Sequence, residues 1–264
     1  MIELLWELRD EVWSLKLNRP AVHNALDEAL INALSDTFDR AADSKARVVV
    51  LSGEGVSFCA GADLSTMRRQ GELSFADNEK AALRLASLFE KIDSCPLPVV
   101  ARVQGAAVGG GVGLVAACDV AVADAGAVFS LAEVRLGLVP AVISPYVIRR
   151  IGPSHARDLV LTGRRIPAAE ALRIGLVHRV AESANLDVAV QEVILNLKAG
   201  GPEALTRAKR LLREVSARLD GPREALASYT ASEIAEARAS EEGRAGAAAF
   251  LEKKRPPWAR GGGA

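Results

Sequence analysis

The sequence predicts an α/β fold whose last third is a helical appendage. In the first half of the chain, short apolar segments alternate with amphipathic segments, a pattern that indicates buried strands covered by helices on both faces of a sheet. From Ser144 to about Pro256 the apolar residues recur at helical spacing, and glycines and prolines mark the breaks. The chain of 264 residues suits one large domain or two modest ones. We expect a core over residues 1–195 and a C-terminal helical region over residues 196–264.

The N-terminal elements follow from local patterns. Residues 2–18, IELLWELRDEVWSLKLN, alternate in polarity on both sides of Asp10-Glu11, which is typical of a β-hairpin. The segments after it are predicted to be an amphipathic helix over 24–45, a buried strand over 47–53, a loop over 53–64, and a mostly helical region over 65–93 that breaks at Gly71.

The middle of the chain continues the alternation. Residues 95–98, CPLP, stop the preceding helix. Three apolar segments are predicted as strands, at 99–105, 118–124 and 127–131, and LVHRV at 176–180 is the one strand-like segment among the later helices.

Composition excludes several classes of protein. The chain has 33 basic and 33 acidic residues, so its zero net charge provides no field that would attract nucleic acid or an anionic membrane. The longest uncharged run, Val103 to Cys118, has 16 residues and is too short and glycine-rich to cross a bilayer. Three widely spaced cysteines indicate a reducing compartment. Glu3 and Glu7 interrupt the N-terminal apolar run, so we expect no signal peptide and a cytoplasmic protein.

The segment Gly105 to Asp119, GAAVGGGVGLVAACD, carries the main functional signal. A strand, a glycine run and a helix in succession often bind an anion at the helix N-terminus. A P-loop would need a Gly-Lys-Ser/Thr ending, which is absent. Residues 111–116 match the dinucleotide pattern G-x-G-x-x-A, but Asp124 comes too early for the ribose-binding acid and Glu133 follows a further strand. The remaining interpretations are tight helix packing and close backbone approach to a ligand.

Several motifs together resemble the crotonase, or enoyl-CoA hydratase/isomerase, superfamily. They fall in the expected order over nearly the whole chain: NRPAVHNAL at 18–26, FCAGADL at 58–64, VGGGVGL at 108–114, EVRLGLVP at 133–140, LTGRRIPAAEALRIGLVHRV at 161–180 and AFLEKKRPPW at 249–258. The resemblance implies a spiral of repeated ββα turns. It also implies that the helical C-terminal region forms trimer contacts, within a homotrimer or a hexamer of two trimers.

The resemblance also implies a catalytic site for acyl-CoA thioesters. The backbone N–H groups of Ala62 and Gly110 would form an oxyanion hole for the thioester oxygen as it becomes an enolate, and Glu133 would be the general acid and base. Fixed donors of this kind contribute on the order of 3 kcal/mol each to transition-state stabilisation. The alternative for Glu133 is a solvated carboxylate at a helix start.

One position departs from the family pattern. Family hydratases usually carry a second glutamate three residues after the middle glycine, and here that position is Gly113. We expect an enoyl-CoA hydratase of fatty acid metabolism that adds water to a short or branched 2-enoyl-CoA. The alternatives are a Δ3,Δ2-enoyl-CoA isomerase, which needs one carboxylate, and a non-catalytic acyl-CoA-binding protein.

The resemblance implies further contacts with the acyl-CoA substrate, mostly through the backbone. The matching residues are Val22, His23, Ala60, Asp63, Leu64, Gly109 and Phe250. We expect no metal site and no separate cofactor, because coenzyme A is part of the substrate.

A short stretch is similar to one subgroup of the family. Residues 133–152, EVRLGLVPAVISPYVIRRIG, resemble bacterial hydratases of the methylglutaconyl-CoA type. Ser144 or Tyr146 in this stretch could reach the acyl pocket. The alternatives are that Ser144 caps a helix and that Tyr146 packs in the core.

Overall fold

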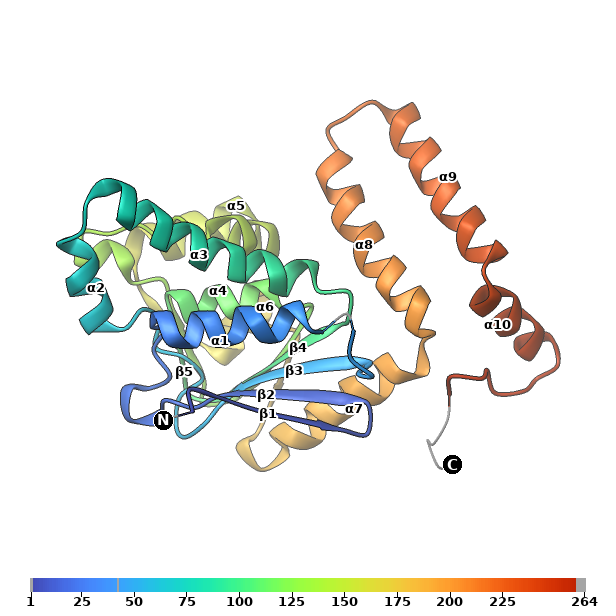
Figure 1. The fold of residues 1–264 in the computed structure, drawn as a ribbon, viewed down its shortest axis with the longest axis horizontal. Coiled ribbons are helices and arrows are strands. Elements are labelled where there is room, and N and C mark those ends of the chain that lie inside the picture. Colours follow the sequence, from blue (N-terminus) through green and yellow to red (C-terminus); the bar gives the residue numbers. More distant parts are fainter. Residues whose placement is uncertain (1, 42, 260–264) are drawn as a thin grey trace.

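The computed structural model describes residues 2–41 and 43–259, and it contains two sheets surrounded by helices (Figure 1). The larger sheet has the strand order β1-β2-β3-β4-β6-β9 and the smaller has the order β5-β7-β8. The strands are β1 (Leu4–Arg9), β2 (Val12–Leu17), β3 (Val48–Gly53), β4 (Val99–Val103), β5 (Ala106–Val108), β6 (Val120–Asp124), β7 (Val128–Ser130), β8 (Arg165–Pro167) and β9 (Arg179–Ala181).

Helices connect and cover these strands. The α-helices are α1 (Glu28–Asp39), α2 (Leu64–Gly71), α3 (Phe75–Ser94), α4 (Gly110–Ala117), α5 (Ser144–Thr162), α6 (Ala168–Arg173), α7 (Leu186–Ala199), α8 (Pro202–Arg218), α9 (Arg223–Ala239) and α10 (Glu241–Leu251). Short 3-10 helices are η1 (Pro20–Val22), η2 (Glu133–Leu136) and η3 (Ser183–Asn185).

The larger sheet begins as an antiparallel hairpin, β1 with β2, and continues as parallel strands from β2 to β9. Successive residues of β3 point to opposite faces. Val49 and Leu51 join the main core with α1, α3, α4 and α5, whereas Val48 and Val50 join a second cluster against α7. Burial on both faces explains why this strand is apolar throughout.

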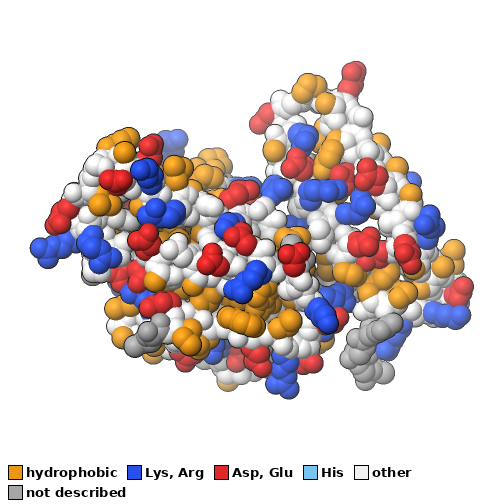
Figure 2. All heavy atoms as spheres, in the orientation of Figure 1, with side chains coloured by type: hydrophobic (Ala, Val, Ile, Leu, Met, Phe, Trp, Pro, Cys, Tyr) orange, Lys and Arg blue, Asp and Glu red, His pale blue; other side chains and the backbone are white. Residues whose placement is uncertain are grey.

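The last three helices form an arm that projects from the core, as Figure 1 shows in orange and red. None of α8, α9 and α10 has a buried residue in the isolated chain, and Figure 2 shows apolar side chains on this arm beside many charged ones. Side chains of α8, among them Thr206 and Lys209, attach it to the core. Thr206 donates to the Pro96 carbonyl over 2.9 Å, and the ammonium of Lys209 lies 2.7 Å from the carboxylate of Asp119.

The predicted class of fold is confirmed: an α/β core is followed by a helical C-terminal region. The N-terminal hairpin and the strands at 48–53, 99–103 and 120–124 lie where they were predicted. Sequence patterns missed β5 and β8, which have three residues each and are too short to show a periodicity. The break expected at Gly152-Pro153 is confirmed, because the backbone of α5 leaves helical geometry at Gly152, with φ of 73°, and two helices join there at a kink.

Buried Asn24 fixes the turn between β2 and α1. Its side-chain amide donates to the carbonyls of Glu54 and Ser57 over 2.9 and 2.8 Å, and its oxygen accepts from the Arg19 N–H over 2.9 Å. The residue is fully buried and has φ of 57°, a left-handed conformation that asparagine tolerates better than most residues. The turn is therefore held against the segment that leads into residues 58–63.

Asn24→Ala should lower the free energy of unfolding by about 3 kcal/mol, because three buried or partly buried backbone groups lose their partner and alanine is strained at positive φ. Asn18→Ala is the matched control, since Asn18 makes an exposed hydrogen bond to Ile2 and should cost under about 1 kcal/mol. Urea unfolding followed by circular dichroism measures both. Equal losses would contradict the role given to Asn24.

Candidate active site

Residues 59–63 form a loop that lies against β5. The Cys59 N–H donates to the Ala106 carbonyl over 3.0 Å, and the Val108 N–H donates to the Cys59 carbonyl over 2.9 Å. Gly61 has φ of 90°, and a Cβ atom on it would lie 2.7 Å from the Val108 carbonyl oxygen. Only glycine fits at this point.

The next close approach is between this loop and the start of α4. Gly109 has φ of 50° and donates its N–H to the Ser130 carbonyl over 2.8 Å. A Cβ atom on Gly61 would lie 3.5 Å from the Gly110 nitrogen, and one on Gly111 would lie 2.2 Å from the Cys59 carbonyl oxygen. The glycine run therefore brings the first turn of α4 onto the 59–62 backbone.

The two amides named from the sequence thus lie on adjoining segments. Gly110 is the first residue of α4, and the amides of a first helical turn have no partner within the helix. The Leu26 N–H binds the Gly61 carbonyl and the Asp63 N–H binds the Leu26 carbonyl. Between them the Ala62 N–H has no acceptor within residues 2–41 and 43–259. Both N–H groups remain available to a ligand.

Glu133 is the first residue of η2, directly after β7 and beside the glycine run. A Cβ atom on Gly109 would lie 2.8 Å from Oε1 of Glu133, so the carboxyl group packs against the backbone that precedes Gly110. Its Oε2 is buried and has no hydrogen-bond partner in the described part of the chain. Burial raises the pKa of the Glu133 carboxyl above its ordinary value. This environment differs from that of a solvated carboxylate at a helix start.

Gly113, on the next turn of α4, faces an apolar wall. A Cβ atom on Gly113 would lie 2.3 Å from Cγ2 of Ile143 and 3.0 Å from Cε1 of Phe89. Ile143 and Phe89 are both buried. The space that a longer side chain at position 113 would need is therefore filled, and no second carboxylate can be placed there without repacking.

The N-terminal loop supports the 59–63 segment from the other side. The Ala60 N–H donates to the carbonyl of His23 over 2.9 Å, and Nδ1 of His23 lies 2.9 Å from the Ser57 hydroxyl. Val22 and His23 are exposed on this loop. The structure therefore brings Val22, His23 and Ala60 together.

Asp63 is buried at the N-terminus of α2, and its contacts give it a structural role. Its carboxylate accepts from the N–H and hydroxyl of Ser65 and pairs with Arg19 at 3.1 Å. The Ser65 hydroxyl, then the Thr66 N–H and the Arg19 guanidinium, hold the pKa of Asp63 below its usual value. Arg19 also pairs with Glu3 and Asp27 at 2.9 Å. Sequence reasoning missed Arg19 and Asn24, because their partners are distant in sequence.

Leu64 and Phe250 lie apart from each other. Leu64 is the first residue of α2, next to the loop. Phe250 is highly exposed on α10, and within one chain α10 lies at the opposite end of the molecule from α2 (Figure 1). A single chain does not bring Phe250 to the other residues.

Ser144 and Tyr146 have partners that account for them. The Ser144 hydroxyl donates to the Ala141 carbonyl over 2.8 Å at the start of α5. Tyr146 is buried, its ring lies 5.8 Å from that of Phe89, and its hydroxyl donates to Glu90. The contacts of Tyr146 confirm the packing interpretation, whereas Ser144 is not a cap, because the N-cap of α5 is Ile143 and no side chain caps this helix.

Neither a metal centre nor a membrane span is found where the structure describes the chain. Over residues 2–41 and 43–259, no three His, Cys, Asp or Glu side chains gather as metal ligands would. In the same ranges, no helix combines the length and the hydropathy that crossing a bilayer requires.

Comparison with known proteins identifies the family. The family model described as "Enoyl-CoA hydratase/isomerase" matches residues 7–261. A putative enoyl-CoA hydratase of Thermus thermophilus is 39% identical over 197 residues, which cover 74% of this chain and 78% of that protein. A probable enoyl-CoA hydratase of Rhodobacter capsulatus is 34% identical over 96% of this chain and 95% of its own.

Solved structures agree with this assignment. The crystal structure of an enoyl-CoA hydratase from Shewanella pealeana superposes with a TM-score of 0.93 at 37% identity, covering 97% of this chain and 96% of that one. The chain belongs to the enoyl-CoA hydratase/isomerase family, and its fold is of the crotonase type.

The Gly113 packing can be tested by a double-mutant cycle. Gly113→Ala should lower the free energy of unfolding by about 2 kcal/mol, because its methyl group overlaps Ile143. Combining it with Ile143→Ala should cost less than the sum of the two single changes, because the smaller side chain makes room. Thermal and urea unfolding of the four proteins measure the coupling. Strict additivity would mean that the two residues are not in contact.

Proposed function

We propose that this protein is an enoyl-CoA hydratase that adds water to a short or branched 2-enoyl-CoA. The observation that carries the proposal is the Glu133 carboxyl, whose Oε2 is buried and without a partner in the described residues, beside the glycine run that presents the Gly110 amide next to the 61–62 loop. The relatives named as hydratases support the same reaction.

The proposed mechanism uses the groups of this chain in two steps. Water adds through its oxygen to C3 of the enoyl group while the Glu133 carboxylate accepts one of its protons. The π electrons move onto the thioester oxygen, and the Ala62 and Gly110 N–H groups stabilise the enolate. Glu133 then returns the proton to C2, which re-forms the carbonyl group. One carboxyl group thus serves as base and then as acid.

A Δ3,Δ2-enoyl-CoA isomerase is the second candidate, and the packing at Gly113 favours it. Moving a double bond needs one carboxylate that removes a proton from C2 and returns it to C4. The apolar wall of Ile143 and Phe89 leaves position 113 without a polar group. Mass spectrometry of 2-butenoyl-CoA and 3-butenoyl-CoA reactions separates the two candidates, because hydration adds the mass of water and isomerisation leaves the mass unchanged.

The proposal extends to the rest of the substrate. Coenzyme A would lie along the loop that carries Val22, His23 and Ala60, contacting mostly backbone, and Asp63 and Leu64 would border it at the start of α2. No cofactor besides the substrate's own coenzyme A is needed for this chemistry. The three buried, unpaired cysteines suit a cytoplasmic, reducing setting.

The arm supports a homotrimer or a hexamer built from two trimers. Its apolar side chains are left open in the single chain, and the largest exposed ones are Leu212, Leu219, Ile234, Phe250 and Leu251. Helices without a buried face gain stability by packing against another copy. In such an assembly Phe250 would meet the coenzyme A of a neighbouring subunit.

The oligomer is expected to sediment with the mass of three or six protomers. Leu212→Glu on the exposed face of α8 should shift the protein toward smaller species, because a carboxylate is costly to bury. Exposed Leu83→Glu on α3 serves as a comparison away from the arm. Analytical ultracentrifugation measures both, and a monomeric wild-type protein would refute the assembly.

Glu133→Gln should lower kcat for hydration by about 10³-fold, because the amide can neither accept nor return the proton. Substrate affinity should change little, since the coenzyme A contacts remain. Glu79→Gln, an exposed change on α3, is the control and should leave kcat unaltered. If Glu133→Gln keeps the wild-type kcat for every acyl-CoA tested, another group transfers the proton; absence of turnover in the wild-type protein would indicate a binder.

The pH dependence of kcat/KM should reflect the raised pKa of Glu133. Burial favours the protonated acid, so the carboxylate takes up a proton at a higher pH than an ordinary glutamate. The reaction begins with the ionised form, and activity is therefore expected to fall as pH decreases, with a midpoint above the ordinary value of 4.5. Stopped-flow rates between pH 4 and 8 measure it. A midpoint at or below 4.5 would contradict the buried placement.

A further inference from the structure

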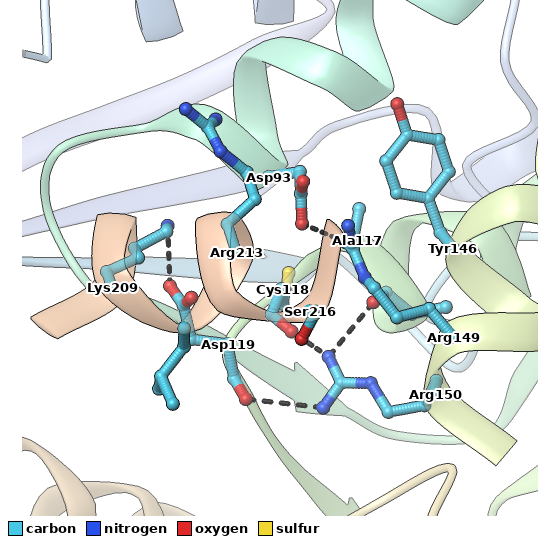
Figure 3. Close-up of a pocket in the computed structure, with 12 residues that line it drawn as sticks. Asp93, Ala117, Cys118, Asp119, Tyr146, Arg149, Arg150, Lys209, Arg213 and Ser216 are labelled. Atoms are coloured by element: carbon cyan, nitrogen blue, oxygen red, sulfur yellow. Dashed lines mark hydrogen bonds and ion pairs between the residues drawn. The ribbon is translucent and has the colours of Figure 1, made fainter. Parts of the chain in front are cut away.

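The guanidinium group of Arg150, on α5, binds backbone carbonyl groups at the C-terminal end of α4. Its Nη2 donates to the Ala116 carbonyl over 2.9 Å and also to the Cys118 carbonyl, and its Nη1 donates to the Asp119 carbonyl over 3.2 Å. Figure 3 shows the guanidinium reaching these backbone oxygens. Arginine near a helix C-terminus binds the unpaired carbonyls and compensates the negative end of the helix dipole.

Helix α4 packs by apolar contacts along its length, and Arg150 supplies a polar contact at its C-terminal end. It contains no charged or hydrogen-bonding side chain, and Gly111 to Ala117 are all buried. Its N-cap, Gly109, provides no side-chain cap, which leaves the first-turn amides free for a ligand. Over residues 2–41 and 43–259, the side-chain hydrogen bond to the α4 backbone comes from Arg150, at the C-terminal end of the helix.

The two ends of α4 are close. Eight residues span about 12 Å at 1.5 Å per residue. Arg150 carries its positive charge at one end, and the proposed oxyanion develops at the other. A cation held behind the helix favours negative charge in front of it.

We propose that Arg150 is a positioning residue for the oxyanion hole: it anchors and electrically compensates the C-terminus of α4, so that the Gly110 N–H stays directed at the thioester oxygen. The inference rests on the proposed function in assuming that Gly110 contacts this oxygen. Arg150 itself touches no substrate.

The neighbouring arginine provides a matched control. Arg149 and Arg150 both border the same cavity, of about 270 Å³, which also adjoins Asp93, Asp119 and Lys209. Arg149 is paired with Asp93 of α3 and lies over the Tyr146 ring at 5.6 Å. It therefore contributes the same charge to this cavity while binding a different element.

Arg150→Met is expected to lower kcat about tenfold with little change in KM, because enolate stabilisation is lost while coenzyme A binding is kept. Arg149→Met should leave both constants within about twofold. Arg150→Lys, which keeps the charge but has fewer directed donors, should fall between them. Equal kcat values for Arg150→Met and Arg149→Met would overturn the proposal.

A spectroscopic measurement separates positioning from general stability. Butyryl-CoA labelled with ¹³C at its carbonyl is saturated and does not react, and its infrared C=O band shifts to lower frequency when N–H donors polarise it. The band should shift in wild type and Arg149→Met and move back toward its position in solution in Arg150→Met. An unchanged band in Arg150→Met would also overturn the proposal.

Chemical rescue covers the case in which Arg150→Met folds poorly. Arg150→Ala opens a space next to the cavity, and added guanidinium chloride at millimolar concentration should restore part of kcat, whereas sodium chloride should not. Failure of guanidinium to restore the rate or the carbonyl band of folded Arg150→Ala counts against the proposal.

The proposed function and the role of Arg150 are refuted by different results. Wild-type protein that polarises the carbonyl but neither hydrates nor isomerises enoyl-CoA would refute the enzyme while leaving Arg150 in its role. If the wild-type protein and Arg150→Met turn over enoyl-CoA equally fast, the proposed function stands and the role of Arg150 is refuted.

Discussion

The site depends on how closely the backbone of residues 59–62 approaches that of residues 107–111. Two hydrogen bonds link Cys59 to β5, and a Cβ atom at Gly61 or Gly111 would overlap a carbonyl oxygen of the opposite segment. Because both segments continue into fixed elements, α2 on one side and α4 on the other, the approach sets where the Ala62 and Gly110 amides lie. Glu133 packs on the same glycine run, so the carboxyl group is positioned by the same contact.

Much of this arrangement could be predicted from the sequence. The apolar segments of β3, β4 and β6 are buried on both faces, which gives a strong and unambiguous pattern. Local signals also placed the glycine run at the start of a helix. The family resemblance then singled out Ala62, Gly110 and Glu133, and their roles stay predictions until activity is measured.

Other parts could not be predicted because they depend on contacts between distant residues. Nothing near Arg19 or Asn24 in the sequence indicates that they hold the loop before α1 against residues 54–63. The filling of the space beside Gly113 depends on Ile143, thirty residues further along the chain. Arg150 reads as one of two adjacent arginines on a helix, and only the structure shows that one binds α4 and the other binds α3.

The donors proposed for the oxyanion hole, Ala62 and Gly110, use their main-chain N–H groups, and this has an evolutionary consequence. No amino-acid replacement can delete an N–H group except proline, so mutations damage such a site chiefly by adding bulk at its glycines. Side chains around the acyl group of the proposed substrate can meanwhile diverge to accept new acyl groups. In the proposed site, main-chain groups would stabilise the enolate and side chains would select the acyl group. Related proteins could therefore change their substrate while keeping the same reaction.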